Sequence, residues 1–458
     1  MIKKLKICGF RGFGIEQEIS FALPCKDKVG SGLTIITGSN NSGKTTIVEA
    51  IRAFNNTTSP SISEGKRNIQ TNGFVKLDLT DENDKNITIE TVPSGGSPTI
   101  KNENKKFNYY IVPSRRSMTF EFNKTKMNRE QYIANAHSLE NQRNSVLRSF
   151  ESRIFHIHEN KDKFDKLIKK ILGYDFKWHI EQRDSSMYYI RFNDKDVIHS
   201  GEGLGDGIWS VFTICAAFVD APKQSTIIID EPELSVHPII QKRLMRLFMD
   251  FSENNQIIIC THSPYFISWE AIANGAQLIR IVKEGANSRC YHLPDEFHKK
   301  VTGLNMDLNN PHLLGLEANE VFFLEDNIIL VEGQEDIIIL KKIAKVLGKN
   351  LEENFFGWGV GGAPKMKIFL NLFKNLGYHN IAVILDGDQK SRFDELKTEF
   401  ESCGYKFYIL PTDDIRDKRE RTLPEKNGIA DEKGNLKDTY KEQINKILDE
   451  IQAQISNK

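Results

Sequence analysis

Eight consecutive residues, 38–45, place glycines, a lysine and a hydroxyl at the spacing of a phosphate-binding loop. The sequence Gly-Ser-Asn-Asn-Ser-Gly-Lys-Thr fits the pattern G-x-x-x-x-G-K-[ST], in which backbone N–H groups curl around phosphates. We expect Lys44 to meet the β- and γ-phosphate charge and the hydroxyl of Thr45 to hold Mg²⁺. The expected nucleotide contacts are Gly38, Asn40, Asn41, Ser42, Gly43, Lys44, Thr45 and Thr46.

Two further strand ends carry groups that suit the same chemistry. Asp230 and Glu231 follow a β-branched run at 226–229; the first suits a Mg²⁺ shell and the second can polarise an attacking water. Such a pair alone is an ordinary acidic strand end, but a phosphate loop in the same chain favours the catalytic interpretation. His262 follows the run 256–260, and the carboxyl ends of parallel strands are where ligand sites form.

A glycine-rich loop offers a second phosphate contact. Ser200, Gly201 and Glu202 lie in the glycine-rich loop 200–207, which precedes an apolar helix expected at 208–219. Hydroxyl and backbone N–H donors at a helix N-terminus suit an anionic ligand. We therefore assign these three residues to the nucleotide site.

A separate set of carboxylates lies in the C-terminal half. Glu332 follows the apolar run 328–331, and Asp386 and Asp388 follow the run 381–385. In a parallel sheet both strand ends meet at one edge, so their oxygens can bind Mg²⁺ or Mn²⁺. Asp336, one helical turn beyond Glu332, is a weaker fourth ligand.

These groups must be positioned by alternating strands and helices, which predict parallel sheets. The strand expected at 33–37 enters the phosphate loop, a helix follows it, and 74–79 with 86–92 resembles a hairpin. Between 101 and 184, 18 Lys and Arg face 11 Asp and Glu with helical periodicity, which indicates a basic helical insertion. The remaining expected strands are 188–192, 226–229, 256–260, 328–331, 355–360 and 381–385, and the remaining helices are 208–219, 238–251, 336–347, 364–376 and a C-terminal helix from about 440.

Composition excludes several classes of protein. The 458 residues, 39% hydrophobic and 27% charged, are typical of a globular chain of two or three domains. Lys and Arg total 62, as do Asp and Glu, so any nucleic-acid surface must be a local patch. No run is long enough for a membrane helix, and six scattered cysteines without a C-x-x-C pair indicate reduced core residues of a cytoplasmic protein.

The order of the first set of motifs resembles the ATP-binding-cassette (ABC) type of ATPase head. Phe10-Arg11-Gly12-Phe13 narrows the resemblance to recombination and chromosome-maintenance ATPases. In that family two heads enclose ATP, which implies a homodimer or higher homo-oligomer in which Ser200, Gly201 and Glu202 contact the γ-phosphate on the partner's Lys44. The resemblance makes His262 the γ-phosphate switch. The loop departs from the usual Leu-Ser-Gly-Gly-Gln, and no glutamine loop is found.

The second set resembles a TOPRIM domain, the metal-binding fold of topoisomerases, primases and some nucleases. An ATPase head followed by TOPRIM resembles the OLD (overcoming lysogenization defect) nucleases over residues 1–60, 195–320 and 326–420. The resemblance implies that Glu332, Asp386 and Asp388, with Asp336, hold two metals that cut a phosphodiester. Arg416 stands where the family has an acid, so Asp414 or Asp417 is a substitute, and Lys426 is the candidate for the family's C-terminal lysine.

The resulting expectation is an α/β protein with an ABC-type P-loop ATPase head at 1–320, a Rossmann-like TOPRIM nuclease domain at 326–420 and a helical tail at 421–458. Its function would be an ATP- and metal-dependent endonuclease in anti-phage defence, restrained in some relatives by a partner encoded beside it. DNA is the favoured substrate, with Arg115, Arg116, Arg143 and Arg148 as candidate phosphate contacts. The alternatives are an RNA-cutting toxic effector, such as one acting on tRNA, and a scaffold that cuts nothing.

Overall fold

The computed structural model describes residues 1–458 except 57, 93–96, 104–106, 108, 117–120, 141–146, 148, 195–196, 295, 298–326, 350, 352–353, 419–425 and 457–458. The side chains of residues 193–194, 197–200, 202 and 455–456 are not described either. The chain divides into two compact units, Met1–His292 and Leu293–Lys458. The boundary expected between 320 and 326 lies outside the described residues. Within the described part, no helix is both long and apolar enough to cross a membrane.

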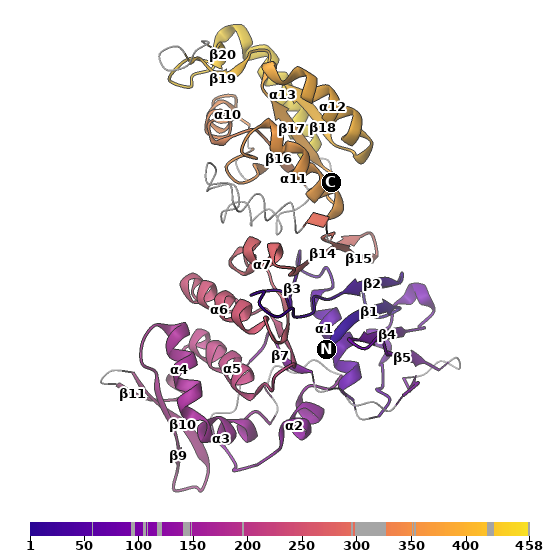
Figure 1. The fold of residues 1–458 in the computed structure, drawn as a ribbon, viewed down its shortest axis with the longest axis vertical. Helices are drawn as coiled ribbons and strands as arrows, with labels where there is room; N and C mark the ends of the chain where they lie inside the picture. The colour runs from indigo at the N-terminus through magenta and orange to yellow at the C-terminus, as the bar shows by residue number, and fades with distance from the viewer. Residues whose placement is uncertain are drawn as a thin grey trace. The chain divides into compact units, whose positions relative to one another are not determined.

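The first unit is organised around a six-stranded sheet (Figure 1). Its order is β15 (Asn287–His292), β14 (Gln277–Glu284), β3 (Leu33–Gly38), β13 (Gln256–Cys260), β12 (Thr226–Asp230) and β7 (Tyr110–Val112). Every neighbouring pair is parallel except β14 and β15. Strands β3, β12 and β13 are buried at every residue, as their runs of Ile predict for a sheet covered on both faces. The expected parallel sheet is confirmed.

Helices follow these strands at the predicted places. The main ones are α1 (Lys44–Asn55), α5 (Asp206–Asp220) and α6 (Pro238–Phe251), with a short α7 (Trp269–Ala273) before β14. The sequence of α5 is apolar almost throughout, and ten of its residues are buried. Because α1 begins inside the phosphate loop, its packing sets the position of Lys44 and Thr45.

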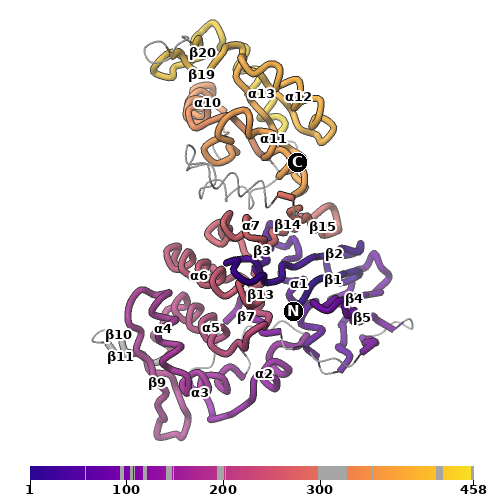
Figure 2. The backbone as a smooth tube through the Cα atoms, in the orientation of Figure 1, coloured from indigo at the N-terminus to yellow at the C-terminus, as the bar shows by residue number. Residues whose placement is uncertain are grey.

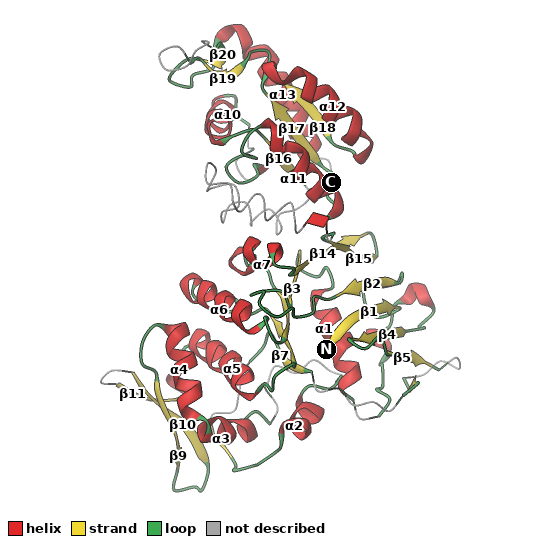
Figure 3. Cartoon of the chain, viewed as in Figure 1, coloured by secondary structure: helices red, strands yellow, loops and turns green. Residues whose placement is uncertain are grey.

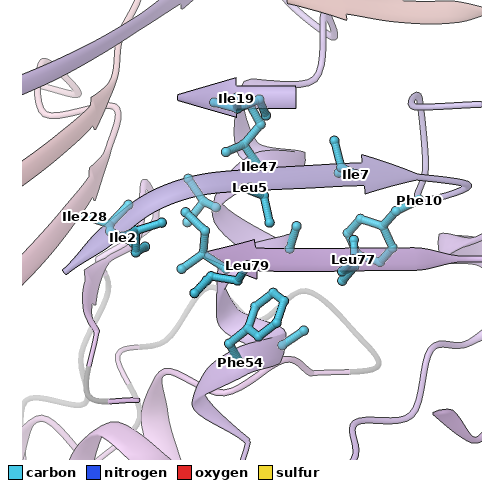
Figure 4. Close-up of a cluster of buried hydrophobic side chains, with 14 of the residues drawn as sticks. Ile2, Leu5, Ile7, Phe10, Ile19, Ile47, Phe54, Leu77, Leu79 and Ile228 are labelled. Carbon is cyan, nitrogen blue, oxygen red and sulfur yellow. The ribbon is translucent and has the colours of Figure 1, made fainter. Parts of the chain in front are cut away.

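A second sheet anchors α1. It is antiparallel, in the order β2 (Gln17–Ser20), β1 (Ile2–Cys8), β4 (Lys76–Asp81), β5 (Asn86–Thr91) and β6 (Thr99–Lys101). Figure 4 shows its inward residues, such as Leu5 and Leu79, in one cluster with Ile47 and Phe54 of α1. All four side chains are fully buried, so this apolar contact holds the helix that carries the loop.

The prediction that the basic segment 101–184 is a helical insertion is only partly right, because pairing with neighbouring strands makes parts of it β-strands (Figure 2). It supplies β7 to the central sheet and the helices α2 (Arg129–Ala136), α3 (Glu151–Glu159) and α4 (Lys161–Leu172). Strands β8 (Glu121–Phe122) and β9 (Lys177–Gln182) join β10 (Tyr188–Asp194) and β11 (Val197–Ser200) in a small sheet. Phe164 of α4 and Trp178 of β9 pack against Phe212 of α5, which ties the segment to the unit.

The second unit has a three-stranded parallel sheet, β16 (Ile328–Leu330), β17 (Ile381–Leu385) and β18 (Lys406–Ile409) (Figure 3). Helices α10 (Gln334–Val346), α11 (Ala363–Asn375), α12 (Lys390–Phe400) and α13 (Asp438–Ser456) accompany it, and β19 (Asp414–Arg416) pairs with β20 (Gly428–Ala430). The strand expected at 355–360 is wrong. Only isolated bridges occur there, because Gly357 and Gly359 adopt positive φ values of 50° and 88° that break an extended run.

Candidate functional site

The loop between β3 and α1 has the backbone that its glycines allow. Gly38 and Gly43 lie at φ 143° and 121°, and Asn41 at 63°, all in the positive region that favours glycine or asparagine. A Cβ on Gly38 would lie 2.3 Å from the carbonyl oxygen of Ile281, so this position also requires glycine for lack of space. The loop therefore has the curled backbone that its glycine spacing predicts for a phosphate-binding loop.

Residues of the segment Phe10 to Phe13 and of strand β15 pack against this loop. Phe13 is fully buried, and its ring lies 3.1 Å from where a Cβ on Gly43 would stand. Ser288 of β15 donates its hydroxyl to the carbonyl oxygen of Ser42 at 2.6 Å. The N-terminal motif thus packs directly against the phosphate loop.

Lys44 is held inside the loop. Its Nζ donates to the carbonyl oxygens of Gly38 and Ser39, each at 2.9 Å. Burial lowers the pKa of Lys44, while nearby Asp230 and Glu231 oppose that shift. The ammonium therefore lies between the loop carbonyls and the acidic end of β12.

Thr45 and Asp230 form the pair expected of a Mg²⁺ site. Thr45 Oγ1 lies 3.2 Å from Asp230 Oδ2, although β13 separates their two strands in the sheet. Asp230 is only 3% exposed at the carboxyl end of β12. A hydroxyl and a carboxylate are hard oxygen donors of the kind Mg²⁺ takes, so these two residues fit the ion.

Glu231 and His262 complete the edge of the central sheet. Glu231 lies in the left-handed region at φ 51°, and its N–H donates to the carbonyl of Cys260 at 2.8 Å. Burial and the Lys44 charge lower the pKa of His262, which favours a neutral imidazole at pH 7.

Sequence reasoning missed Glu233 at this edge. Its carboxylate accepts the backbone N–H of His262 at 2.6 Å and the hydroxyl of Thr261 at 2.8 Å. Burial raises the pKa of Glu233. The available signal was the spacing Asp-Glu-Pro-Glu, which places a third carboxylate two residues after Glu231.

The loop at 200–203 precedes α5 as expected. Gly201–Gly203 forms a short 3-10 turn, and Gly201 is buried. The side chains of Ser200 and Glu202 lie outside the described part of the structure, so their assigned contacts stay predictions.

In the second unit, the predicted carboxylates gather where β16 and β17 end. The backbone N–H of Asp386 donates to Glu332 Oε1 at 3.1 Å, which joins the two strand ends directly. Asp336 accepts the N–H of Gly333 at 2.8 Å and so caps the start of α10. Asp388 follows two residues after Asp386, in the turn Gly387–Gln389.

Burial and like charge both disfavour the ionised forms of these carboxylates. Burial, and then the charges of Asp336, Glu332 and Asp414, raise the pKa of Asp386 to about 9. Burial, Glu332 and Asp414 raise that of Asp336 to about 7. Asp414 of β19, one of the two substitutes predicted for the missing acid, lies beside the cluster, because Lys426 Nζ is 3.8 Å from Asp414 Oδ2 and 2.7 Å from Asp388 Oδ2.

This donor set fits a divalent cation, because several buried carboxylates of like charge are stabilised by a hard cation that neutralises them. As the side chains stand, no three His, Cys, Asp or Glu among the described residues enclose an ion position. The fit therefore rests on the chemistry of the donors and on their shared edge of the sheet.

Cations border the cluster on one side. Lys426 Nζ lies 2.7 Å from Asp388 Oδ2, and Lys418 Nζ lies 2.7 Å from Asp414 Oδ2. Although burial acts to raise it, hydrogen bonds from Lys426 and Gln389 lower the pKa of Asp388. Lys426, the candidate for the family's C-terminal lysine, is thus in contact with the predicted metal ligand Asp388.

Comparisons with known proteins divide the chain in the same way. Residues 107–268 match the family described as "AAA domain, putative AbiEii toxin, Type IV TA system". Residues 323–388 match the family described as "Overcoming lysogenization defect protein-like, TOPRIM domain". The chain is also 30% identical over 154 residues to an OLD nuclease of Thermus scotoductus (strain ATCC 700910 / SA-01).

An AAA-type ATPase domain followed by an OLD-like TOPRIM domain is the domain order that the resemblance to OLD nucleases predicted. The predicted fold class, an α/β ATPase head followed by a TOPRIM domain, is confirmed. The aligned part covers 32% of this chain and 28% of the length of the Thermus relative.

Solved structures of SMC head domains are also similar to the chain. The head from Thermotoga maritima has a TM-score of 0.39 at 16% identity and covers 64% of this chain and 99% of that one. The Pyrococcus furiosus head with an extended coiled coil, bound to the C-terminal domain of ScpA, has a TM-score of 0.41 at 15% identity, covering 66% and 99%.

The contacts of Arg416 and Asp417 bear on which residue replaces the acid that the OLD family has near position 416. Arg416, which stands where the family has an acid, forms an ion pair with Glu335 of α10. Glu335 is not one of the predicted metal ligands. Asp417 accepts from Lys437 at 2.7 Å and from the N–H of Gly428 at 2.9 Å. Asp417 therefore stabilises the β19–β20 pair, whereas Asp414, the other predicted substitute, lies within 3.8 Å of Lys426 Nζ. The role of Asp414 stays a prediction.

The predicted nucleic-acid contact Arg116 is wrong. Arg116 is 6% exposed and binds backbone carbonyls at the end of β12, because its guanidinium points into the unit. Arg115 is exposed as expected, whereas Arg143 and Arg148 lie outside the described residues.

Proposed function

We propose that this protein is an ATP-regulated, divalent-metal-dependent endonuclease that cuts DNA. The observation that carries the proposal is the direct contact between the ends of β16 and β17, where the N–H of Asp386 meets the carboxylate of Glu332. This contact brings the predicted ligands to one edge of a TOPRIM sheet. The presence of a P-loop site in the same chain supports control by ATP.

Glu332, Asp386 and Asp388 would hold Mg²⁺ or Mn²⁺, with Asp336 and Asp414 as neighbouring acceptors. When bound, such ions generate a nucleophilic water and offset charge on the leaving oxygen of a phosphodiester. Lys426 holds Asp388 ionised and orients it from outside the cluster. Its ammonium also lies where it can attract a phosphate of the substrate.

At the nucleotide site, ATP and Mg²⁺ would be bound by residues 38–46 and Asp230. Glu231 would orient the attacking water, and His262 would respond to the γ-phosphate. Ser200, Gly201 and Glu202 would complete the site of a second chain, so the active form is at least a homodimer. Binding by Lys44 and Thr45 is supported by their position between the loop carbonyls and Asp230.

Several features favour a role inside the cell as a defence effector. The six cysteines are all free, which suits a reducing cytoplasm, although only Cys215 and Cys260 are buried. The description of the matched ATPase family includes an AbiEii toxin of a Type IV TA system. Anti-phage defence, with a possible partner encoded nearby, is the context we propose.

Incubation with supercoiled plasmid DNA or total RNA, with Mg²⁺ or Mn²⁺ and with or without ATP, tests this proposal. We expect metal-dependent nicking or linearisation of the plasmid and loss of all cutting with chelator. Cutting of RNA alone would replace DNA by RNA as the substrate. If the protein cuts neither DNA nor RNA, with or without ATP, the proposed nuclease activity is contradicted and the hypothesis of a non-cutting scaffold is favoured.

A further inference from the structure

A buried arginine binds the backbone next to the nucleotide site. Arg116 follows β7, the strand that pairs with β12. One terminal nitrogen of its guanidinium donates to the carbonyl oxygens of both Asp230 and Glu231, each at 2.8 Å. The other donates to the hydroxyl of Ser210 in α5. The side chain therefore joins the end of β12 to the start of α5.

The charge of this arginine is retained in spite of burial. Burial lowers the pKa of Arg116 to about 10, while Asp230, Glu233 and Glu231 oppose the shift, so the guanidinium stays protonated at pH 7. Burying a charge is unfavourable unless hydrogen bonds and nearby opposite charges compensate. Compensation here comes from the acidic end of β12, which makes the two features depend on each other.

The backbone that Arg116 holds is an unusual one. Glu231 lies in the left-handed region, which a residue with a side chain adopts at a cost that its surroundings must offset. The backbone N–H of Glu231 donates to the carbonyl oxygen of Cys260 at 2.8 Å, and the backbone carbonyl oxygen of Glu231 accepts from Arg116. Both backbone polar groups of Glu231 are therefore fixed, and with them the direction in which its carboxylate leaves the strand.

The start of α5 contacts the same region at two further points. Trp209 Nε1 donates to the carbonyl oxygen of Arg116 at 2.7 Å. A Cβ on Gly207 would lie 2.3 Å from the carbonyl oxygen of Ser235, so the helix start lies against the loop after β12. Helix α5 begins at Asp206, three residues after the turn Gly201–Gly203. Only two residues, Leu204 and Gly205, therefore separate that turn from the helix whose start contacts Arg116.

We infer that Arg116 is a positioning residue for ATP hydrolysis, which orients Glu231 through its backbone and links that orientation to α5 and the loop before it. This inference rests on the proposed ATPase function. Arg116 need not touch the nucleotide, so it should affect turnover far more than nucleotide affinity. Coupling through α5 would let the glycine loop report to Glu231 whether the composite site is closed.

The test compares Arg116→Gln and Arg116→Lys with wild type in nucleotide binding and in steady-state hydrolysis. We expect ATP affinity to stay within about threefold and kcat to fall by at least about tenfold in Arg116→Gln. Arg116→Lys should recover part of kcat, because an ammonium keeps the charge but cannot reach both carbonyls and Ser210 at once. Arg183→Gln, which changes an exposed arginine just after β9, should behave like wild type.

Ser210→Ala tests the link to α5 with a milder change. It removes one hydrogen bond, so kcat should fall by roughly three- to tenfold at unchanged affinity. Combined with Arg116→Gln it should add little further loss, since both changes break the same link. A folded Arg116→Gln with wild-type kcat, or full additivity of the two changes, would overturn the inference. If Arg116→Gln does not fold, a wild-type kcat in Ser210→Ala would likewise overturn the inference.

These outcomes are distinguishable from failure of the proposed function. If wild type hydrolyses no ATP under any condition, the ATPase proposal itself fails. If wild type hydrolyses ATP and Lys44→Ala does not, the ATPase stands, and the Arg116 variants alone decide this inference.

Discussion

Lys426 Nζ contacts Asp388 Oδ2 at 2.7 Å, which links the C-terminal part of the second unit to the end of β17. Exposed ion pairs contribute little to the stability of the fold. Because this pair is partly exposed, we expect its loss to change the cleavage rate more than the stability. We predict that Lys426→Ala lowers the cleavage rate by at least tenfold, about 1.4 kcal/mol in the transition state, with little change in melting temperature. Lys433→Ala, at an exposed lysine of the same region, is the matched control.

Lys44→Ala should abolish ATP binding, because the loop then neutralises the β- and γ-phosphates with N–H groups alone. Equilibrium binding of a fluorescent ATP analogue measures this directly. Equal affinity of Lys44→Ala and wild type would remove the phosphate-loop assignment.

Glu231→Gln should instead bind ATP with normal affinity and hydrolyse it slowly, since only the carboxylate that orients the water is lost. Single-turnover hydrolysis should fall by about two orders of magnitude or more, in line with loss of a catalytic base. Normal turnover would leave the phosphate loop in place and remove only the role of Glu231.

Trapping ATP should also reveal the oligomeric state. With Glu231→Gln in saturating ATP, light scattering should give at least a dimer, because the loop at 200–203 is expected to complete a neighbouring chain's site. The same measurement on Lys44→Ala provides the control without bound nucleotide. A strict monomer of Glu231→Gln in ATP would contradict the composite site.

His137 predicts how stability depends on pH. Its Nδ1 accepts the N–H of Ile111 in β7 at 2.8 Å, and burial, followed by Arg52 and Arg129, lowers its pKa well below 6.5. The unfolded chain therefore binds this proton first, and stability falls as pH drops below about 6.5, by up to about 1.4 kcal/mol per pH unit.

The free energy of unfolding, measured with urea at pH 7.0 and 5.5 for wild type and His137→Gln, checks this effect. Since glutamine does not titrate, the variant should lose less stability between the two pH values. The half-exposed His156, changed to Gln, is the control. An identical loss in wild type and His137→Gln would exclude His137 as its source.

Much of the fold could be predicted because the strands that position the sites are short apolar runs ending in polar motifs. Runs such as 226–229 and 381–385 have the β-branched composition of buried parallel strands, and their carboxyl ends mark the site. Strand β7 could not be found this way, since Tyr110–Val112 is three residues in a basic segment and becomes a strand through pairing with β12. At 355–360 the apolar pattern instead predicts a strand that does not form, because its glycines adopt positive φ values.

The same limit applies to the sites. Glycines, Lys44 and the strand-end carboxylates are local patterns, whereas the places of Arg116, Asp414 and Lys426 depend on contacts between distant parts of the chain. Arg116 looked like a surface cation because charge alone does not show burial. Only the fold places its guanidinium against Asp230 and Glu231.

Plasmid cleavage by Asp386→Ala, measured beside ATP hydrolysis by the same preparation, tests the central claim most directly. Removing Asp386 takes a carboxylate from the expected metal site, and metal-dependent chemistry of this kind contributes several kcal/mol to the transition state. We predict cleavage at least about a hundredfold below wild type, with ATP turnover largely intact, in Mg²⁺ or Mn²⁺. Wild-type cleavage by Asp386→Ala, on a substrate that wild type demonstrably cuts, would place the nuclease site elsewhere and contradict the account.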